Sequence, residues 1–409
     1  MKNTLDIQKD FPQIKRIIRG KPIVYLDSTA TSLKPQSVID KENEYYTKYT
    51  ANIFRGIYTT SEEATQEYED ARTKVAAFIG ATNPHEIVFT RNASESVNLF
   101  AYSYGLHEIH SGDHIVVSIM EHHSNFVPWQ QLGKDRGWNL DIWRTTADGQ
   151  LDLKALETLI TKKTKVLAVT ALSNVLGTIT PIAKIVEIVK KINPDCLILV
   201  DAAQAAPHMV IDVNAWGADV VVFSSHKMLG PTGIGILWGK YELLERMQPF
   251  MYGGEMIEEV TEQKSLFKKP PHKFEAGTPH IAGVIGFGAA IDYLTSLGMD
   301  TVREHEMDLV QYASKQLARI SGLTVYGPTD SAVKGGVMAF TLKGSHPHDI
   351  AQVLNEDNIC IRSGNHCAMP LHLAMGLSAT ARASFYIYTT HEDIDLLVEG
   401  LEKVKKIFL

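Results

Sequence analysis

Two apolar runs in the sequence end on side chains that can take part in chemistry. LILVDAAQ places Asp201 at the end of one run, and VVVFSSHK places Lys227 just beyond the next. Asp201 alone is typical of a helix N-cap, but a buried strand-end carboxylate can also pair with a protonated heterocyclic nitrogen. Lys227 alone is typical of a surface loop or a phosphate ligand, whereas burial would lower its pKa and make its amine a nucleophile. Their presence on neighbouring predicted strands favours the chemical interpretation of both.

A polar loop and a histidine pair follow two further apolar runs. In FTRNASES, the backbone N–H groups at Ala93 and Ser94 begin a predicted helix, where they and the helix dipole suit a phosphate group. The same pattern is typical of an ordinary helix cap. In SIMEHHSN, His122 and His123 are adjacent, so their side chains diverge and make a poor metal site, and no HExxH-like spacing occurs in the sequence. An imidazole of this pair either stacks on a flat cofactor or belongs to an ordinary loop histidine.

One of the three cysteines has a setting that favours reactivity. Cys367 lies in the loop RSGNHCAMPLH, with a histidine beside it and Arg362 nearby, which makes it a candidate thiolate. Alone, a loop cysteine is more often inert. Cys196 and Cys360 each lie inside an apolar run and are expected to be core thiols. Three irregularly spaced cysteines favour neither a disulfide framework nor a zinc site, so the cytoplasm is the expected compartment.

The elements that must position these side chains are short apolar runs alternating with helical stretches. Helices are predicted at 95–105 and 181–192. Continuous apolar strands indicate a sheet covered on both faces, and strand–helix–strand order makes it mostly parallel, hence an α/β fold. In such sheets ligands bind beyond the carboxyl ends of the strands. The predicted strands are 86–90, 114–120, 166–172, 197–203 and 219–225.

The C-terminal part predicts a smaller α+β domain. A helix is expected over 299–320, followed by LTVYG, VMAFTL and the segment NICIRSG, and then by a last helix over 391–407. The predicted division is a large α/β domain over 25–295, with an extended excursion at about 252–280. The small domain would combine residues 1–24 with 296–409 and carry the Cys367 loop.

Bulk properties exclude several classes of function. The chain has 409 residues, 21% of them charged, and a net charge of −7, which gives no reason to expect nucleic acid or an anionic membrane as a partner. The N-terminal segment lacks the apolar core of a secretory signal, and no apolar run reaches the roughly 18–20 residues of a membrane span.

Taken together, the motifs resemble the SUF-type cysteine desulfurases, a group within the class V aminotransferase family of pyridoxal-phosphate enzymes. SSHK followed by GPTGIG, with D-x-x-Q upstream, points to class V, HCAMPL points to the SUF-type branch, and GGEMI (253–257) is most similar to members from Gram-positive bacteria. The resemblance covers nearly the whole chain and implies the fold of type I pyridoxal-phosphate transferases. Its segments are YLDSTATSLKP, RGIYTTS, EHHSNFVPWQ, SNVLGT, VDAAQAAPH, SSHKMLGPTGIG, FEAGTP, RSGNHCAMPL and ATARASFYIY.

The resemblance implies a set of residues around pyridoxal 5'-phosphate. Lys227 would be the Schiff-base lysine and later move the Cα proton, Asp201 would pair with the pyridinium nitrogen, and His122 would stack on the ring. Gln204 would bind the phenolic oxygen. Thr278 would reach the phosphate of a neighbouring subunit, which makes a homodimer part of the site. The implied phosphate ligands within the subunit are Ala93, Ser94, Ser224 and His226.

The resemblance also implies a substrate and a path for its sulfur. Arg382 and Asn174 would hold the carboxylate of L-cysteine, and Arg362 would flank the substrate. Cys367 would take the sulfur as a persulfide and leave alanine, and selenocysteine is a second candidate substrate. In relatives from Gram-positive bacteria the acceptor is a small zinc-bearing protein that supplies iron–sulfur cluster assembly, which His348 of HPHD would contact.

The chain departs from the family pattern twice. Phe54 stands where relatives usually have the histidine of His-Arg-Gly, and Asn365 replaces the first histidine of Gly-His-His-Cys. The second change removes one candidate proton donor beside the thiol. Two alternatives to desulfurization remain open at this point. They are another class V activity, such as an aminotransferase or β-lyase with Cys367 incidental, and a non-catalytic scaffold, which the presence of Lys227 and Asp201 disfavours.

Overall fold

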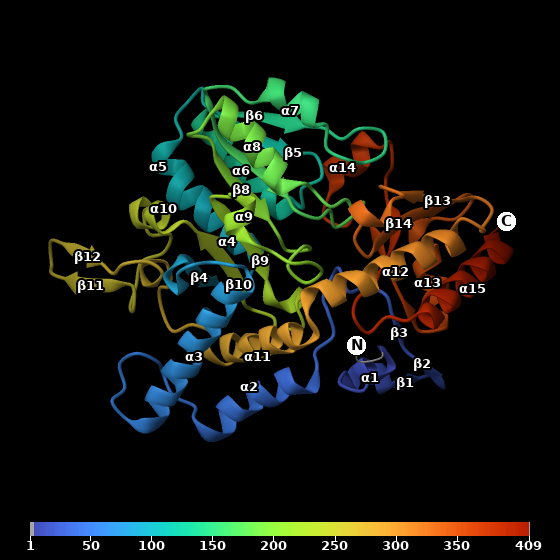
Figure 1. The fold of residues 1–409 in the computed structure, drawn as a ribbon, viewed down its shortest axis with the longest axis horizontal. Coiled ribbons are helices and arrows are strands. Elements are labelled where there is room, and N and C mark those ends of the chain that lie inside the picture. Colours follow the sequence, from blue (N-terminus) through green and yellow to red (C-terminus); the bar gives the residue numbers. More distant parts are fainter. Residues whose placement is uncertain (1–3, 409) are drawn as a thin grey trace.

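The computed structural model describes residues 4–408, and its centre is a seven-stranded sheet with the order β4–β10–β9–β8–β7–β5–β6 (Figure 1). Neighbours from β9 to β6 run parallel, whereas β10 is antiparallel to both β9 and β4. The predicted mostly parallel α/β sheet is therefore confirmed. The strands are β4 (Ile87–Thr90), β5 (His114–Ser118), β6 (Asn139–Trp143), β7 (Thr164–Thr170), β8 (Leu197–Asp201), β9 (Val220–Ser224) and β10 (Gly235–Gly239).

Strands β6 and β10 are absent from the sequence-based prediction. Residues of β6 are mostly only partly buried, and β10 is a five-residue run bounded by glycines, so neither gives the long apolar signal of β7 or β8. Close packing requires a glycine at position 235 in β10. A Cβ atom there would lie 2.3 Å from the backbone carbon of Asn92, so only glycine lets β10 approach the loop before α4.

Helices cover both faces of this sheet, which explains its continuous apolar strands. In β8, Ile198 and Val200 pack in a core shared with α3, α8 and α11, while Leu199 packs on the opposite face with α4, α6 and α10. Both faces are thus closed to water, and the carboxyl ends of the strands stay accessible. The covering helices are α2 (Gln36–Lys48), α3 (Thr59–Phe78), α4 (Ala93–Phe100), α6 (Val127–Arg136), α8 (Ile182–Ile192), α10 (Tyr241–Arg246) and α11 (Ile281–Leu297).

A second, four-stranded antiparallel sheet with the order β13–β14–β17–β16 lies beside the large one, at the right in Figure 1. Its helices surround a separate apolar core. The short strand β3 (Val24–Tyr25) pairs in parallel with β15 (Ile359–Cys360), which joins the N-terminal segment to this part. The proposed domain boundaries stay predictions. The elements here are α12 (Met299–Leu317), β13 (Leu323–Tyr326), β14 (Val337–Leu342), α13 (Pro347–Glu356), β16 (Arg362–Gly364), α14 (Met369–Ala374), β17 (Thr380–Ser384) and α15 (His391–Phe408).

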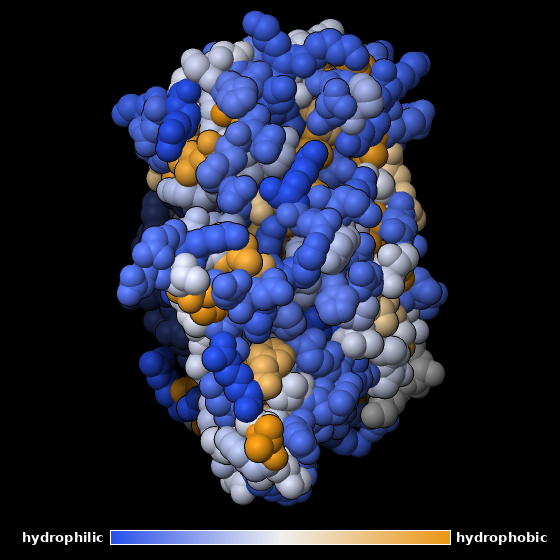
Figure 2. Space-filling view, turned by 90° about the vertical axis from the view of Figure 1, so that its left-hand side faces the viewer, coloured by the Kyte–Doolittle hydropathy of each residue, from blue (hydrophilic) through white to orange (hydrophobic). Residues whose placement is uncertain are grey.

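Within the segment 252–280, residues 257–267 leave the body of the molecule as a hairpin. Phe274 is instead buried in an apolar core of the large sheet, so the prediction that the whole segment is an excursion needs correction. Strands β11 (Ile257–Val260) and β12 (Ser265–Phe267) pair antiparallel and extend outward at the left of Figure 1. Figure 2 shows this side of the molecule as mostly hydrophilic, with small separate apolar patches.

Within residues 4–408, no single helix is long and apolar enough to cross a membrane. Helices α11 and α12 together have the length and composition of a membrane span, but the pair is bent by 74°. The remaining helices are α1 (Thr4–Gln8), α5 (Leu106–Glu108), α7 (Leu153–Leu159) and α9 (Val213–Trp216).

Candidate active site

A cavity of about 280 Å³ opens at the carboxyl ends of the parallel strands, where the large sheet meets the four-stranded sheet. It collects most of the residues that the sequence singled out. Cys367 and Thr278 do not line it. The predicted residues that line it are Ala93, Ser94, His122, Asn174, Asp201, Gln204, Ser224, His226, Lys227, Arg362 and Arg382.

Asp201 and Lys227 lie on the ends of two adjacent strands. Asp201 is the last residue of β8, and Lys227 follows β9 in a single 3₁₀ turn, Ser225–Lys227. Asp201 is 5% exposed and accepts a hydrogen bond from the Ala203 N–H at 2.9 Å. Burial raises its pKa, while the same effect lowers the pKa of Lys227 to about 8, against the opposing pull of Asp201. The lysine lines the cavity, and its amine changes from charged to neutral as the pH rises through about 8.

His122 presents a neutral imidazole to the cavity. Burial lowers its pKa to about 3, so it carries no charge at neutral pH, and its Nδ1 lies 2.9 Å from the Ser124 hydroxyl. The preceding residue, Glu121, is fully buried, and burial raises its pKa to about 8. Glu121 accepts hydrogen bonds from the Thr170 N–H and the Asn125 amide, both at 2.7 Å. It therefore links the segment after β5 to the end of β7, a role that sequence reasoning missed.

The opposite end of the cavity has donors suited to a phosphate group. Ala93 begins α4, and its N–H donates to the Ser224 hydroxyl at 2.8 Å. Ser94 and Ser124 share a short hydroxyl–hydroxyl hydrogen bond. Burial lowers the pKa of His226, which also lines the cavity, to about 4. Helix N-termini with nearby hydroxyls bind phosphate, and Ser124 is a further candidate that the sequence did not single out.

Arg382 is a buried guanidinium held on two sides. Its Nη2 donates to Asp27 Oδ1 at 3.0 Å, and its Nη1 donates to the Asn174 carbonyl at 3.0 Å. Nε has no hydrogen-bond partner. Burial lowers its pKa to about 10, so the group stays cationic at neutral pH. Asp27, which sequence reasoning missed, counters a charge that would otherwise be costly to bury.

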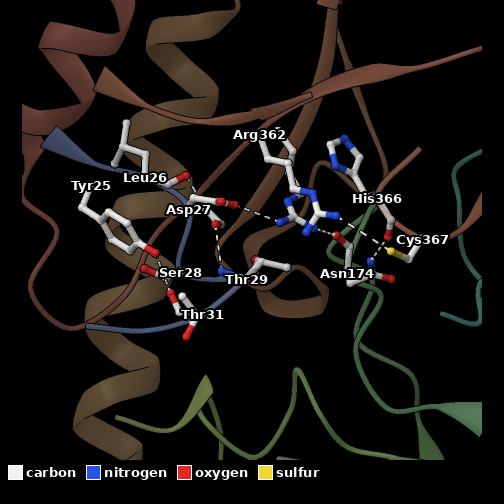
Figure 3. Close-up of polar contacts among 12 residues, drawn as sticks. Tyr25, Leu26, Asp27, Ser28, Thr29, Thr31, Asn174, Arg362, His366 and Cys367 are labelled. Atoms are coloured by element: carbon white, nitrogen blue, oxygen red, sulfur yellow. Dashed lines mark hydrogen bonds and ion pairs between the residues drawn. The ribbon is translucent and has the colours of Figure 1, made fainter. Parts of the chain in front are cut away.

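The Cys367 loop joins β16 to α14 and lies at the edge of the cavity. Cys367 Sγ is 3.8 Å from Arg362 Nη2, the contact drawn in Figure 3. The Asn365 carboxamide oxygen accepts the Cys367 N–H at 3.1 Å, which is the two-residue turn that asparagine favours. His366 is buried with its pKa lowered to about 2, so it holds no extra proton at neutral pH. The departure at position 365 thus has a conformational role in this loop.

The other cysteines are shielded. Cys196 is fully buried, and burial raises its pKa to about 12. Cys360 is only partly buried, so its expected place in the core needs correction, but burial still raises its pKa. All three cysteines are free. A raised pKa keeps a thiol protonated and unreactive, which leaves Cys367 as the thiol placed beside a cation at the cavity.

Four buried polar atoms at the cavity have no hydrogen-bond partner among residues 4–408. They are Gln204 Oε1, Thr29 Oγ1, Arg382 Nε and His366 Nδ1. Unpaired buried polar groups are costly, so a ligand with both donors and acceptors would stabilise this arrangement. With a strand-end carboxylate, a lysine and a phosphate cradle, the residues fit pyridoxal phosphate. Among residues 4–408, no cluster of three or more His, Cys, Asp or Glu side chains could hold a metal ion.

Two predicted residues lie elsewhere. Thr278 is exposed and lines a separate cavity of about 470 Å³. His348 is exposed on α13, its ring stacked on His346 with centroids 5.1 Å apart. Phe54, which has a positive φ of 73°, packs edge-on against Tyr68 and His272, away from the main cavity.

Comparison with known proteins agrees with this site. Residues 24–397 match the family model of class-V aminotransferases. A probable cysteine desulfurase of Streptomyces coelicolor is 50% identical, covering 99% of this chain and 98% of its own, and one of Halalkalibacterium halodurans is 48% identical over 99% of both. The apo structure of a cysteine desulfurase from Thermococcus onnurineus has a TM-score of 0.94 and 39% identity over 99% of both chains. The chain therefore belongs to the class V aminotransferase family, as one of its pyridoxal-phosphate-dependent cysteine desulfurases.

Proposed function

We propose that this enzyme transfers the sulfur of L-cysteine to Cys367 and releases alanine. The observation that carries the proposal is that Cys367 Sγ lies 3.8 Å from Arg362, a residue that lines the same cavity as Lys227 and Arg382. The Arg362 guanidinium places a positive charge beside the sulfur atom that would attack the substrate. Arg362 thus both lines the cavity and contacts the Cys367 thiol.

The atoms and electrons of this transfer balance without an outside oxidant. The Cys367 thiolate would bond to the substrate sulfur while the carbon–sulfur bond of L-cysteine breaks. The electron pair of the broken bond stays with the carbon fragment of the substrate. The carbon skeleton takes up protons to become alanine. L-cysteine and one thiol thus give L-alanine and one persulfide.

Residues of the large sheet would hold the cofactor and move protons. Pyridoxal phosphate, when bound, supplies an electron sink for the substrate's α-carbon. Lys227 would bond to the cofactor and, with the pKa of its amine lowered to about 8, carry the α-proton. Asp201 would keep the ring nitrogen protonated, and the neutral His122 would stack on the ring. Gln204, whose Oε1 has no partner, would face the phenolic oxygen.

Phosphate and substrate would occupy opposite ends of the cavity. The phosphate ligands would be Ala93, Ser94, Ser224 and His226, to which we add Ser124. Arg382 would bind the substrate carboxylate through its unpartnered Nε. The Asn174 amide nitrogen already donates to the His366 carbonyl at 2.6 Å, so we assign Asn174 to the cysteine loop as well as to the substrate.

The acceptor would be a protein of the SUF type, in a cytoplasmic iron–sulfur cluster assembly system. The HCAMPL motif after Asn365 and the GGEMI segment support this branch and a likeness to Gram-positive members. His348 is exposed and so available to contact the zinc of a small acceptor protein. Selenocysteine would serve as an alternative substrate, since selenium is a better leaving atom.

We further propose a homodimer in which Thr278 binds the phosphate of the partner subunit. Thr278 is exposed and lines a cavity away from its own active site. Exposed apolar side chains lie on the excursion or directly beside it. Burial of such side chains favours association. They are Met251, Tyr252, Val260 and Leu266.

Replacement of the cysteines tests the proposed transfer. Cys367→Ser should keep the visible absorbance of bound pyridoxal phosphate but lose alanine production from L-cysteine in the presence of a reductant. Cys360→Ser is the matched control and should retain turnover, because that thiol has a raised pKa. If Cys367→Ser turns over cysteine at the parent rate, the chain acts as a lyase or another class V enzyme instead.

A further inference from the structure

His123 contacts the cysteine loop, whereas its neighbour His122 lines the cavity. The His123 backbone N–H donates to the Cys367 carbonyl at 2.7 Å. The His123 Nε2 accepts the backbone N–H of Met369 at 3.0 Å. The two imidazole rings are 6.3 Å apart and tilted by 50°. His123 therefore bonds to the loop backbone on both sides of Ala368, the residue that follows Cys367.

The loop held by these bonds is in an unfavourable backbone conformation. His366 and Cys367 have φ values of 50° and 59°, two consecutive non-glycine residues in the left-handed region. Each such residue costs roughly 1–3 kcal/mol and persists only where the surroundings fix it. Inside the loop, Asn365 accepts the N–H groups of Cys367 and Ala368. From the loops that follow β7 and β5, Asn174 donates to the His366 carbonyl and His123 bonds to Cys367 and Met369. On the other side, His366 Nε2 bonds to Thr380.

We infer that His123 is a positioning residue for sulfur transfer, which fixes the Cys367 thiol in place by accepting the Met369 N–H. The inference rests on the proposed function, since it concerns where that thiol is held. An acceptor at Nε2 requires a neutral ring with its proton at Nδ1. Burial lowers the pKa of His123, which favours that neutral form. The two adjacent histidines thus make different contacts. His122 lines the cavity, and His123 bonds to the backbone of the cysteine loop.

Two substitutions of His123 by side chains of similar size distinguish its role as a hydrogen-bond acceptor from its role in packing. Glutamine can place a carbonyl oxygen near the position of Nε2, whereas leucine fills the space with no acceptor. We expect His123→Leu to lower kcat for alanine formation by about 10-fold, the equivalent of one lost hydrogen bond that orders a reacting group. KM for L-cysteine and the absorbance of bound pyridoxal phosphate should stay at parent values. His123→Gln should recover most of the rate, and His107→Gln, at an exposed histidine on α5, is the control.

Amide hydrogen exchange gives a readout that does not depend on turnover. The Met369 amide should exchange about 10-fold faster in His123→Leu than in the parent enzyme and near the parent rate in His123→Gln, because its acceptor is lost only in the first. Equal exchange and equal kcat in the leucine variant and the parent would overturn the inference. A parent enzyme that forms no Cys367 persulfide would instead overturn the proposed function, so the two failures are distinguishable.

Discussion

The cofactor cradle and the cysteine loop are held by different kinds of structure. Asp201 ends one fully buried parallel strand, Lys227 follows the end of the next, and Glu121 hydrogen-bonds to the end of the neighbouring strand β7. Cys367 lies instead in a connection between β16 and α14, in a left-handed conformation. A sheet core restrains the first region, whereas a few side-chain contacts restrain the second.

This difference separates two functions in one active site. A strand end in a packed sheet has little freedom, which suits groups that must hold a cofactor in a fixed geometry. A loop on a second structural unit can present its thiol to the cavity and also to an external acceptor. Changes in the cradle should therefore disturb the cofactor, and changes in the loop should disturb sulfur transfer with the cofactor intact.

The strongest test of this separation is Lys227→Ala in the cradle. We expect alanine formation to fall by about 10³-fold or more, since the change removes the proposed covalent attachment and the proposed proton carrier. The visible spectrum of the bound cofactor should change as well. Lys184→Ala, at an exposed lysine on α8, is the control and should leave both unchanged. A spectrum unaffected by Lys227→Ala would place the cofactor elsewhere.

Arg382→Gln changes a residue that lies where the two regions meet. We expect a smaller effect on activity than that of Lys227→Ala. We expect KM for L-cysteine to rise by about 10–100-fold, as a charge-assisted hydrogen bond to the substrate carboxylate is lost. The spectrum of the enzyme without substrate should be unchanged. Steady-state kinetics of alanine release give the split between KM and kcat. A fall in kcat at unchanged KM would assign Arg382 to the thiol rather than to the substrate.

The lowered pKa of Lys227 predicts the pH dependence of cofactor capture. A lysine bonds to an aldehyde as the neutral amine, and with a pKa of about 8 that form becomes dominant as the pH rises through about 8. Addition of pyridoxal phosphate to the apoenzyme should therefore speed up by about 10-fold between pH 7 and pH 9 and then level off. Stopped-flow absorbance measures the rate. A rate still rising steeply above pH 10 would indicate an amine of ordinary basicity.

The smallest effect is expected in the cysteine loop at Asn365. Asn365→Ala removes the acceptor of the Cys367 N–H, a bond worth about 1 kcal/mol, so persulfide formation should slow by about 5-fold. Cofactor absorbance and KM should be unchanged. Asn365→Asp keeps an acceptor and should stay closer to the parent rate. Single-turnover persulfide quantification makes the comparison, and a loss of cofactor in Asn365→Ala would break the separation of the two regions.

The positions of the strand-end residues were easier to predict from the sequence than the conformation of the cysteine loop, for a physical reason. The signals for Asp201 and Lys227 are local, because a long apolar run marks a buried strand and its last residue marks the carboxyl edge. Asp27 and Glu121 were missed because their importance comes from Arg382 and Thr170, which are distant in sequence. Nothing local marks Cys367 as left-handed, since that conformation usually falls on glycine.

Single-turnover transfer from L-cysteine labelled with a heavy sulfur isotope tests the central claim most directly. The enzyme is mixed with one equivalent of substrate, alanine is quantified, and peptides containing each cysteine are analysed by mass spectrometry without reductant. We expect one labelled sulfur on Cys367 for each alanine released. Alanine without label on Cys367, or label on Cys196 or Cys360 instead, would contradict the account.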